Sequence, residues 1–519
     1  MPAPKLSSDM RRKRRLAFWP YGILQKRDCD FSGEPIVTTH SPGSRFPVYK
    51  REHWFSDNWE SPQMDIDWDR SFLDQLYELQ SKTPHFHQLG KNNQNCDYAD
   101  DVWSSKNAYL SRSVLECEDI YYVYRVLYSQ NCMDITYSYE LNHCYECTYC
   151  FKGFNLQFCL DCKDCSDSSF LYDSRGCRHC FMCWNLRNKE YHIFNKPYSK
   201  SEYHKKVDSL RLNSRLFLDE LRRRFLKHIQ NDAVHRDVYI RNSQICQGNF
   251  IDDCKNCTDA FLVEKCEDSH HILRSFVNHS MDATGMLRGE MVYEVSQCTD
   301  LNNVQCAMFS VDCNSSQYLD QCYNCSDCFG CIGLKRKQFC ILNKPYPREE
   351  YIKLKDKLIA KMHEEGEYGD FFPYKFSYHG YNATLAPLYY DETKESIAKK
   401  GGFMEKLPDI DQSGISGDDL TDFSEAISDD LIDKVINCSK TGQPFKFIKQ
   451  ELDFYRTHQL PLPSLHYEER NKMRYNQLPK LHPRNITCSG CEKEVVTYYP
   501  ESSGYKKIMC EECYLKEVY

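Results

Sequence analysis

The side chains best suited to chemistry in this sequence are four cysteines near its end. Cys488 and Cys491 form one Cys-x2-Cys pair, and Cys510 and Cys513 form a second pair after eighteen intervening residues. Zn²⁺ prefers four thiolates in a tetrahedron, and two such pairs supply them when the chain between them doubles back as a hairpin. The sequence therefore predicts one structural zinc ion held by these four residues. All four ligands are thiolates, which leaves no open position for hydrolytic catalysis.

Two other segments resemble this module but lack most of its cysteines. Cys29 is followed by Ser32 where the second ligand would stand, and His53 is the remaining candidate for the second pair. Cys438 is followed in the same way by Thr441. We expect ribbon-like hairpins of the zinc-ribbon or treble-clef type at both places, and we expect them to hold no metal.

Most of the 30 cysteines lie in the middle of the chain, where they recur every fifteen residues. Residues that recur at a fixed period are typical of solenoids, because each coil buries its inward side chains on those of its neighbours. The sequence predicts a mainly β fold with tandem Cys-rich β-solenoids, coils of about fifteen residues and buried thiol columns. Residues 246–290 follow the period less cleanly. The columns are Cys117, Cys132, Cys147, Cys162 and Cys177; Cys150, Cys165 and Cys180; and Cys298, Cys313 and Cys328.

The Cys-x2-Cys-x2-Cys runs within these columns have three interpretations. They could hold further zinc ions or iron-sulfur clusters, since this spacing occurs in cluster proteins. However, Ser, Ile, Val and Ala replace Cys along the same columns. Core positions tolerate such replacement and metal ligands do not, so the pattern favours a buried ladder of thiols.

The solenoid region is a tandem duplication, because residues 177–203 match residues 325–351. Each copy ends in a predicted helix that would cap the open edge of the solenoid; Ser199 and Glu202 form a capping-box pattern. We expect the following parts: a basic arm with a degenerate zinc-ribbon-like module (1–60), the first solenoid (61–198), a helical cap or connector (199–240), the second solenoid (241–346), a helix (347–366), an acidic linker or arm (367–437) and a C-terminal module with the zinc site (438–519).

The net charge of −8 argues against a globally basic nucleic-acid binder, but the first residues are strongly basic. A run of arginines followed by aromatic residues is typical of contacts to phosphate and bases. The residues predicted to bind nucleic acid are Arg11, Arg12, Lys13, Arg14, Arg15, Lys26 and Arg27. A solvated tail is the alternative interpretation.

Three segments together carry a resemblance to a known family: FPVYKREHWFSDNW, the NKPYSKSEY element, and the tail that ends in NITCSGC. They resemble an uncharacterised cysteine-rich family with zinc-ribbon ends, found as hypothetical proteins in candidate-phylum bacteria and large phages. In those relatives the arginine-rich stretches carry an additional CPxC-like knuckle. This sequence has Ser8-Asp9 and His466-Tyr467 at those places. The resemblance implies no activity.

No catalytic motif such as GxSxG, HExxH, GxGxxG or a P-loop occurs in the sequence, which favours a non-enzymatic protein. The first hypothesis is a zinc-binding scaffold or accessory subunit of a nucleoprotein assembly. The second is a protein-only structural component, for example of a phage particle, and the third is an enzyme with Fe-S clusters or several zinc ions. The sequence shows no signal peptide and no membrane span, and its many cysteines indicate a reducing, cytoplasmic compartment. Other proteins of a larger assembly are the expected partners.

Overall fold

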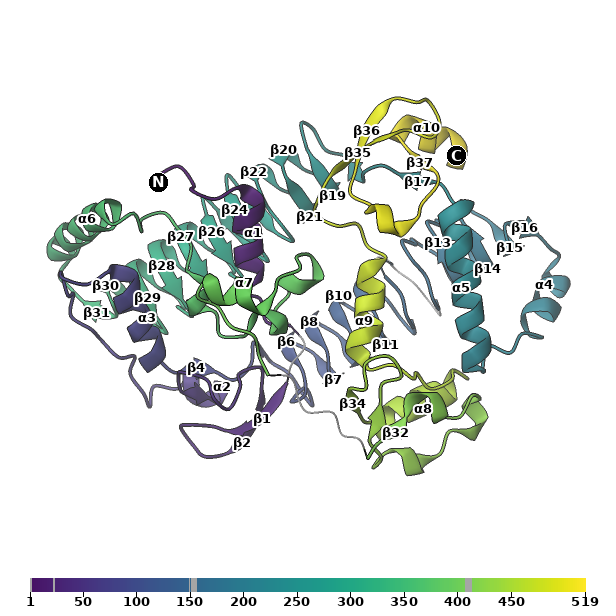
Figure 1. The fold of residues 1–519 in the computed structure, drawn as a ribbon, viewed down its shortest axis with the longest axis horizontal. Helices are drawn as coiled ribbons and strands as arrows, with labels where there is room; N and C mark the ends of the chain where they lie inside the picture. Colours follow the sequence, from purple (N-terminus) through teal and green to yellow (C-terminus); the bar gives the residue numbers. More distant parts are fainter. Residues whose placement is uncertain (1, 22–23, 149, 151–155, 407–412) are drawn as a thin grey trace. The chain divides into compact units, whose positions relative to one another are not determined.

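The computed structural model describes residues 2–21, 24–148, 150, 156–406 and 413–519 (Figure 1). The chain forms two compact units, and each unit combines two separate chain segments. Unit 1 contains Met1–Gln88 and Val238–Lys406, and unit 2 contains Leu89–Asp237 and Leu407–Tyr519. Strands hold 31% of the residues and helices 24%, so the predicted mainly β class is confirmed. Within the described ranges, no helix has the length and apolar character needed to cross a lipid bilayer.

Unit 2 is built on the first solenoid, whose short strands stack in parallel. Strands from successive coils form one ladder in the order β12-β10-β8-β6-β5 and another in the order β11-β9-β7. The solenoid strands are β5 (Gly90–Lys91), β6 (Asp100–Trp103), β7 (Lys106–Tyr109), β8 (Arg112–Leu115), β9 (Glu118–Tyr121), β10 (Tyr124–Leu127), β11 (Gln130–Met133), β12 (Thr136–Tyr139), β13 (Ser169–Tyr172), β14 (Arg178–Trp184), β15 (Glu190–Ile193) and β16 (Lys196–Pro197).

The other elements of unit 2 come from both of its segments. They are α4 (Lys200–Val207), α5 (Arg215–Asn231), β17 (His235–Arg236), β32 (Ile415–Ser416), β33 (Ile436–Asn437), β34 (Pro444–Phe445), α8 (Lys449–Thr457), α9 (Tyr467–Asn476), β35 (Arg484–Thr487), β36 (Glu494–Thr497), β37 (Ile508–Met509) and α10 (Glu511–Val518). Helix α5 packs on β13 and helix α9 on β12, so both cover the solenoid.

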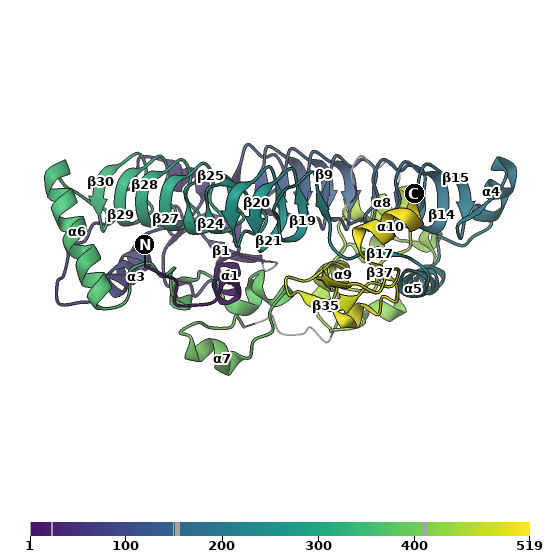
Figure 2. The ribbon, with the colours of Figure 1, turned by 90° about the horizontal axis from the view of Figure 1, so that it is seen from above.

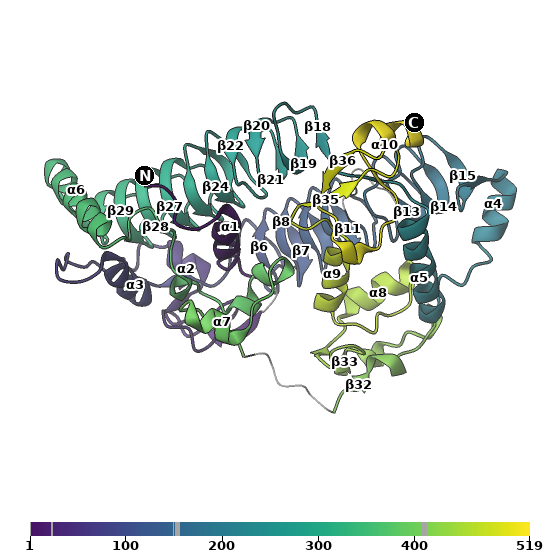
Figure 3. The same cartoon turned by 45° about the horizontal axis from the view of Figure 1, so that its top comes forward.

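Unit 1 repeats this plan around the second solenoid. The solenoid strands are β18 (Ile240–Arg241), β19 (Gly248–Asp252), β20 (Lys255–Thr258), β21 (Ala260–Glu264), β22 (Glu267–His270), β23 (Phe276–Asn278), β24 (Met281–Thr284), β25 (Leu287–Glu290), β26 (Tyr293–Ser296), β27 (Asn302–Met308), β28 (Asn314–Asp320), β29 (Ser326–Ile332), β30 (Gln338–Ile341) and β31 (Lys344–Pro345). The elements around it are α1 (Ser8–Leu16), β1 (Gln25–Asp28), β2 (Pro35–Thr38), β3 (Val48–Tyr49), α2 (Arg51–Phe55), α3 (Phe72–Lys82), β4 (His85–Phe86), α6 (Arg348–Glu364) and α7 (Lys394–Lys399). Figure 3 shows α1 beside β24. Helix α1 also contacts β26, and α3 packs on β29.

The hydrogen-bond register gives a coil of twelve residues. Tyr124 lies beside Thr136 in the first solenoid, and Cys328 lies beside Cys340 in the second. In the first solenoid every third residue joins one continuous buried core, and the second has the same kind of core. The predicted β-solenoid is therefore confirmed, with about 20 turns over the two copies, whereas the predicted coil length of about fifteen residues is wrong. Fifteen residues equal one coil of twelve residues plus three, which is the distance to the next inward position. The fifteen-residue repeat therefore relates inward residues that are diagonal neighbours on adjacent coils.

Part of the second solenoid uses a shorter coil. Glu267 pairs with Asn278 and His270 with Met281, eleven residues later in each case. The register shifts between Phe276 and Val277. This missing residue explains why the sequence repeat is less regular between residues 246 and 290.

The inward spacing of three residues has a cause in the backbone. In a flat strand side chains alternate between the two faces, which gives a spacing of two. Here one residue in three has a positive φ, as in Asn107, Leu110, Ser113 and Glu116. This left-handed conformation is energetically unfavourable for residues that have a Cβ atom. The packing and hydrogen bonds of the coil must therefore offset its energetic cost.

The final coil of each solenoid is closed by the NKPY element. Asn343 replaces the backbone of a following coil, because its Oδ1 accepts from Ile332 N at 2.9 Å and its Nδ2 donates to Ile332 O at 2.8 Å. Asn195 does the same with Trp184, at 3.0 and 2.9 Å. The next two residues fold back as antiparallel β31 and β16. An open strand edge is thereby covered.

A helix then lies over each closed end, as predicted. Helix α6 contacts β30 and helix α4 contacts β15 (Figure 2). Tyr351 packs on Phe339 and Tyr203 on Tyr191, with ring centroids 5.6 and 5.7 Å apart. The capping box that the sequence predicts at Ser199 is present at the start of α4.

Two expected boundaries differ from the spatial arrangement. Residues 61–88 precede the first solenoid in the sequence, but α3 and β4 belong to unit 1, where α3 packs on β29 of the second solenoid. The segment 367–437, expected to be an acidic linker or arm, is divided between the units, and its first part is packed. Phe371, Phe372 and Phe376 are fully buried, because aromatic residues within this acidic stretch cover unit 1's solenoid.

Candidate metal centre

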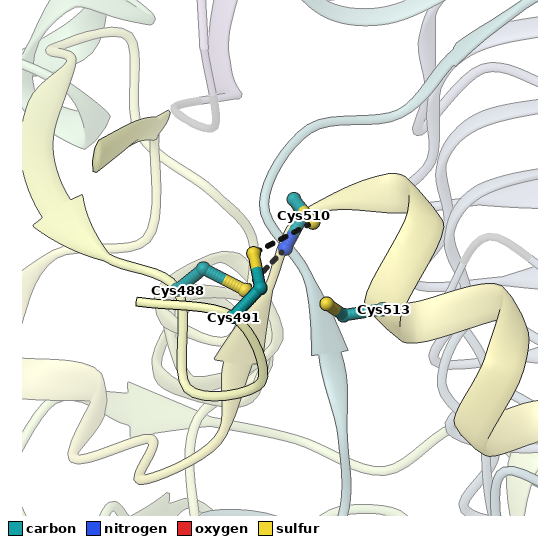
Figure 4. Close-up of side chains that lie close together, drawn as sticks. All are labelled: Cys488, Cys491, Cys510 and Cys513. Carbon is teal, nitrogen blue, oxygen red and sulfur yellow. Dashed lines mark hydrogen bonds between the residues drawn. The ribbon is translucent and has the colours of Figure 1, made fainter. Parts of the chain in front are cut away.

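The four predicted zinc ligands come together at the surface of unit 2 (Figure 4). Cys488 and Cys491 lie in the turn of the antiparallel hairpin β35-β36, and Cys510 and Cys513 lie at the start of α10. Their Sγ atoms all lie within 4.8 Å of one another. Cys488 is buried, Cys491 is exposed and the other two are half-buried. The group can therefore hold a metal ion, and the hairpin with its helix fits a zinc-ribbon-like module.

The spacing of the sulfur atoms fits a small tetrahedral ion. Cys491 Sγ lies 3.8 Å from Cys510 Sγ. Bonds of about 2.3 Å from Zn²⁺ to sulfur place the corners of a tetrahedron about 3.8 Å apart. The close approach also requires Gly490, because a Cβ atom there would lie 2.8 Å from Cys513 Cβ.

Backbone N–H groups favour the thiolate form at this site. Burial alone would raise the pKa of the Cys488 thiol, but N–H groups of Cys510, Gly490 and Cys491 lower it to about 6. Cys510 N lies 3.2 Å from Cys488 Sγ, and Gly490 N lies 3.4 Å from it. The pKa of Cys513 is raised to about 12 by hydrogen bonds to Cys491 and Cys510. Thiolates repel one another here, and a bound dication would remove that repulsion.

The module around Cys29 keeps the backbone of this site. The Cys29 N–H donates to Glu34 O and the Lys50 N–H donates to Cys29 Sγ at 3.2 Å, as Cys510 N does to Cys488. Ser32, Lys50 and His53 stand where Cys491, Cys510 and Cys513 stand in the C-terminal module. His53 Nε2 lies 3.2 Å from a Glu34 carboxylate oxygen.

The module around Cys438 is a third copy of the same turn. The Cys438 N–H donates to Gln443 O, and the Cys438 carbonyl accepts from Gly442 N. His466 caps α9 at the position that Cys510 has before α10. Both hairpins expected from the sequence are therefore present. The expectation that they hold no metal stays a prediction.

The predicted thiol columns lie inside the two solenoids. All eleven are buried: Cys117, Cys132, Cys147, Cys162, Cys177, Cys150, Cys165, Cys180, Cys298, Cys313 and Cys328. Each Sγ donates to the carbonyl two residues earlier; Cys147 to Tyr145 at 3.3 Å is one example. Residues fifteen apart are not stacked, so the true columns join thiols twelve apart, such as Cys328 and Cys340. Among the residues that the structure describes, Cys488, Cys491, Cys510 and Cys513 are the only group of three or more His, Cys, Asp or Glu side chains that is placed so that it could hold a metal ion.

Serine takes the place of cysteine in these columns because both side chains make the same hydrogen bonds. Ser129 Oγ donates to Leu127 O at 2.8 Å and accepts from Leu141 N, twelve residues on, at 3.0 Å. Cys117 Sγ donates to Leu115 O and accepts from Ser129 N, at 3.3 Å in both bonds. A short polar side chain thus satisfies backbone groups that the coil would otherwise bury without partners.

The basic run predicted to bind nucleic acid is a buried helix, α1. Arg11, Arg12, Arg14 and Arg15 are all buried. Arg15 Nη1 lies 2.7 Å from Glu294 Oε2 and 3.0 Å from Asp282 Oδ1, and Arg12 pairs with Asp259. Their guanidinium groups neutralise carboxylates of the solenoid and do not face solvent, which removes the basis for the predicted contact at these four residues.

The remaining predicted nucleic-acid residues are separate from this cluster. Lys13 pairs with Glu392. Arg27 Nη2 lies 2.7 Å from Asp30 Oδ2, whereas Lys26 is exposed on β1. The structure therefore does not bring the seven residues together as one basic surface.

Sequence reasoning missed a second buried arginine cluster in unit 2. Arg470 and Arg474 of α9 pair with Asp134, as Arg11 and Arg15 of α1 pair with Asp282. Arg474 Nε donates to Thr136 and Arg15 Nε to Thr284. The signal was present in the sequence as two arginines four residues apart in both helices, matched by Asp-x-Thr in both solenoids.

Comparison with known proteins gives no assignment for these features. No family model matches the chain, and the search of curated proteins gives no match. The interpretation of the site therefore rests on its geometry.

Proposed function

We propose that this protein is a non-enzymatic scaffold, stabilised by one structural zinc ion, that binds other proteins of a larger assembly. The observation that carries the proposal is the closed set of four cysteine thiols at Cys488, Cys491, Cys510 and Cys513. A complete thiolate tetrahedron stabilises a fold and leaves no coordination position for a substrate.

The buried thiols of the solenoids support the same interpretation. They hydrogen-bond to backbone groups of their own and neighbouring coils, as Cys147 does with Tyr145 and Leu156. Such thiols are explained by folding alone, so an enzyme with Fe-S clusters or several zinc ions needs an additional assumption. The nucleoprotein form of the scaffold hypothesis loses its main support, because the arginines of α1 are buried. A protein-only assembly is therefore the better-supported form.

Native mass spectrometry of the full chain, purified from its own source under reducing and low-oxygen conditions, tests this proposal. We expect one zinc ion per chain and a retained protein partner whose release is insensitive to salt. Retained nucleic acid with strongly salt-dependent release would instead support the nucleoprotein form. Iron, sulfide or several metal ions per chain would contradict the scaffold proposal.

The Cys491→Ser variant provides a matched test of the metal site. It should lose the zinc ion, because three thiolates remain for an ion that prefers four. Cys246→Ser is the control, since Cys246 is half-buried in the other unit and outside the cluster. Full zinc retention in Cys491→Ser would contradict the assignment of this residue.

A further inference from the structure

The two units share a conserved arrangement of covering helices. Helix α1 in unit 1 corresponds to α9 in unit 2, because Arg11 and Arg15 contact Asp282 as Arg470 and Arg474 contact Asp134. Helix α3 corresponds to α5, because each ends shortly before a strand, β4 or β17, that pairs with the ribbon module of its unit. The same solenoid face can therefore be compared in the two units.

In unit 1 this face is covered by residues 367–372, which we call the strap. The Tyr318 hydroxyl accepts from Gly369 N at 2.9 Å, and Cys306 Sγ donates to Asp370 O at 3.5 Å. Phe371 packs edge-on against Phe18, with ring centroids 5.2 Å apart, and lies under the Arg14 guanidinium at 5.8 Å. Phe372 packs on the Tyr318 ring, with centroids 6.2 Å apart, so the strap binds through two phenylalanines and its backbone.

The acidic groups of the strap are also paired. Glu367 accepts from the Ser71 hydroxyl at the start of α3, and Asp370 lies 2.8 Å from Lys5 Nζ. The strap therefore combines aromatic anchors with two carboxylates that meet donors on unit 1. The covered solenoid face of unit 1 therefore accommodates a segment with aromatic and acidic side chains.

The corresponding place in unit 2 is a cavity of about 290 Å³. It lies between α5, α9 and the solenoid, and its lining includes Phe158, Phe170, Met473 and Gln477. By position these four residues are the counterparts of Cys306, Tyr318, Arg14 and Phe18, which the strap contacts in unit 1. In unit 1 the strap follows the end-capping helix α6, whereas in unit 2 residues 208–214 lead from the end-capping helix α4 directly into α5.

Two side chains that are buried in unit 1 have exposed counterparts in unit 2. Arg14 is buried, whereas Met473 is 44% exposed. Leu76 and Leu226 lie at the same distance before the first residues of β4 and β17, His85 and His235, so they are counterparts. Leu76 is buried, whereas Leu226 is 43% exposed. The cavity thus has an apolar rim that unit 1 covers with its own chain.

The lining of the cavity is also cationic. It contains five arginines, namely Arg215, Arg222, Arg223, Arg470 and Arg474, against the two carboxylates Glu146 and Asp219. Arg470 Nε and Arg474 Nη2 are buried and have no hydrogen-bond partner among the described residues. Arg470 and Arg474 pair with Asp134, and Arg222 pairs with Glu146 and Asp219, so two more guanidinium groups than carboxylates remain. These groups, beside aromatic rings, complement a segment that carries both acidic and aromatic side chains.

We infer that this cavity of unit 2 is the docking site for an extended acidic and aromatic segment of a partner protein, similar in chemistry to residues 367–372. The inference rests on the proposed scaffold function, which it deepens by naming the kind of partner. The two can fail separately: several metal ions per chain would contradict the scaffold without touching this site, and failure of peptide binding would leave the zinc scaffold intact.

A peptide that copies residues 365–374 of this chain, labelled with fluorescein, is the probe. Fluorescence anisotropy with the full-length, zinc-loaded protein should show saturable binding of one peptide per chain. A control peptide with alanine in place of Phe371 and Phe372 should bind at least about tenfold more weakly, since aromatic anchors dominate such interfaces. Replacing Glu367 and Asp370 by their amides should weaken binding and remove most of its salt dependence.

Two exposed rim residues allow variants that should not unfold the protein. Leu226→Asp and Met473→Asp each place a carboxylate in the apolar rim and should weaken peptide binding at least about tenfold. Leu216→Asp is the matched control, because Leu216 lies on α5 together with Leu226, is 66% exposed and does not line the cavity. Circular dichroism and zinc content check that all three variants are folded.

Three outcomes would overturn the inference. The first is the absence of saturable binding to the folded protein. The second is binding that Leu226→Asp and Met473→Asp leave unchanged, which would mean that the peptide displaces the strap of unit 1. The third is concentration-dependent self-association that Met473→Asp abolishes without any peptide binding, which would identify a second copy of the chain as the occupant.

Discussion

At the scale of single residues, the close packing of the four cysteines depends on Gly490. A Cβ atom at Gly490 would lie 2.8 Å from Cys513 Cβ and 2.9 Å from its Sγ. Gly490→Ala should therefore push Cys513 out of the cluster and weaken zinc binding by about tenfold or more, the usual effect of changes next to metal ligands. Competition with a chromogenic chelator measures this affinity.

Gly43→Ala is the control for that experiment, because nothing lies within 4 Å of the Cβ that it would add. It should bind zinc like the parent protein. If Gly490→Ala also keeps its affinity, the close packing of the cluster is not needed for metal binding.

Asp320 gives unit 1 a pH dependence with a definite sign. Burial raises the pKa of its carboxyl to about 7, although hydrogen bonds from Tyr378 and Gln80 oppose this shift. The folded state therefore holds a proton that the unfolded state has already released, and stability is lost as the pH rises from about 4 to 7. The free energy of unfolding should fall by up to about 1.4 kcal/mol per pH unit more than in Asp320→Asn.

Urea unfolding of both proteins at several pH values measures this difference. Asp57→Asn is the control, since the Asp57 side chain is 84% exposed, and it should follow the parent protein. Parallel pH profiles for the parent and Asp320→Asn would show that Asp320 is ionised in the fold.

At the scale of elements, the coil depends on short polar side chains that bridge backbone groups. Ser129→Ala removes the acceptor for Leu141 N in a buried position, so the free energy of unfolding should fall by about 1 to 3 kcal/mol. Ser129→Cys keeps a group that can donate and accept, as Cys117 does on the preceding coil, and should be the more stable variant. Equal stability of the two variants in urea would contradict this role of the columns.

The closing asparagine can be tested in a similar way. Asn343 has a φ of 65° and bonds to Ile332 and to Pro62 O. Asn343→Gly loses the side-chain bonds and keeps the left-handed turn, whereas Asn343→Ala also adds about 1 to 2 kcal/mol of backbone strain. Thermal unfolding should rank the proteins as parent, Gly variant and Ala variant, and a more stable Ala variant would contradict the analysis.

The element scale also shows how far the sequence could be interpreted. The period of inward residues, the duplication and the end caps were visible, because they follow from residue types at fixed spacing. The coil length was not visible, because inward residues are related by any multiple of three residues. Only the hydrogen-bond register shows that one coil has twelve residues. The cysteine spacing predicted the cluster of four thiols. The burial of Arg15, in contrast, depended on Asp282 and Glu294, which lie far away in the sequence.

At the scale of the whole molecule, most thiols should be protected by folding and not by metal. Of the cysteines outside the metal cluster, only Cys246 is not buried. The zinc-loaded protein should therefore react with a thiol reagent at about one site, and chelation should add Cys491, Cys510 and Cys513. Denaturant should expose all 30 cysteines. Rapid reaction of many thiols before unfolding would contradict the buried ladder.

The alternation of chain segments between the two units has a consequence for synthesis. The first solenoid belongs to unit 2, but the residues that complete that unit, 407–519, are translated after both segments of unit 1. Until α9 and the ribbon module have left the ribosome, the aromatic face formed by Tyr145, Phe158 and Phe170 has no cover from them. Unit 1 can therefore mature first, and the nascent first solenoid needs protection from premature association for most of translation.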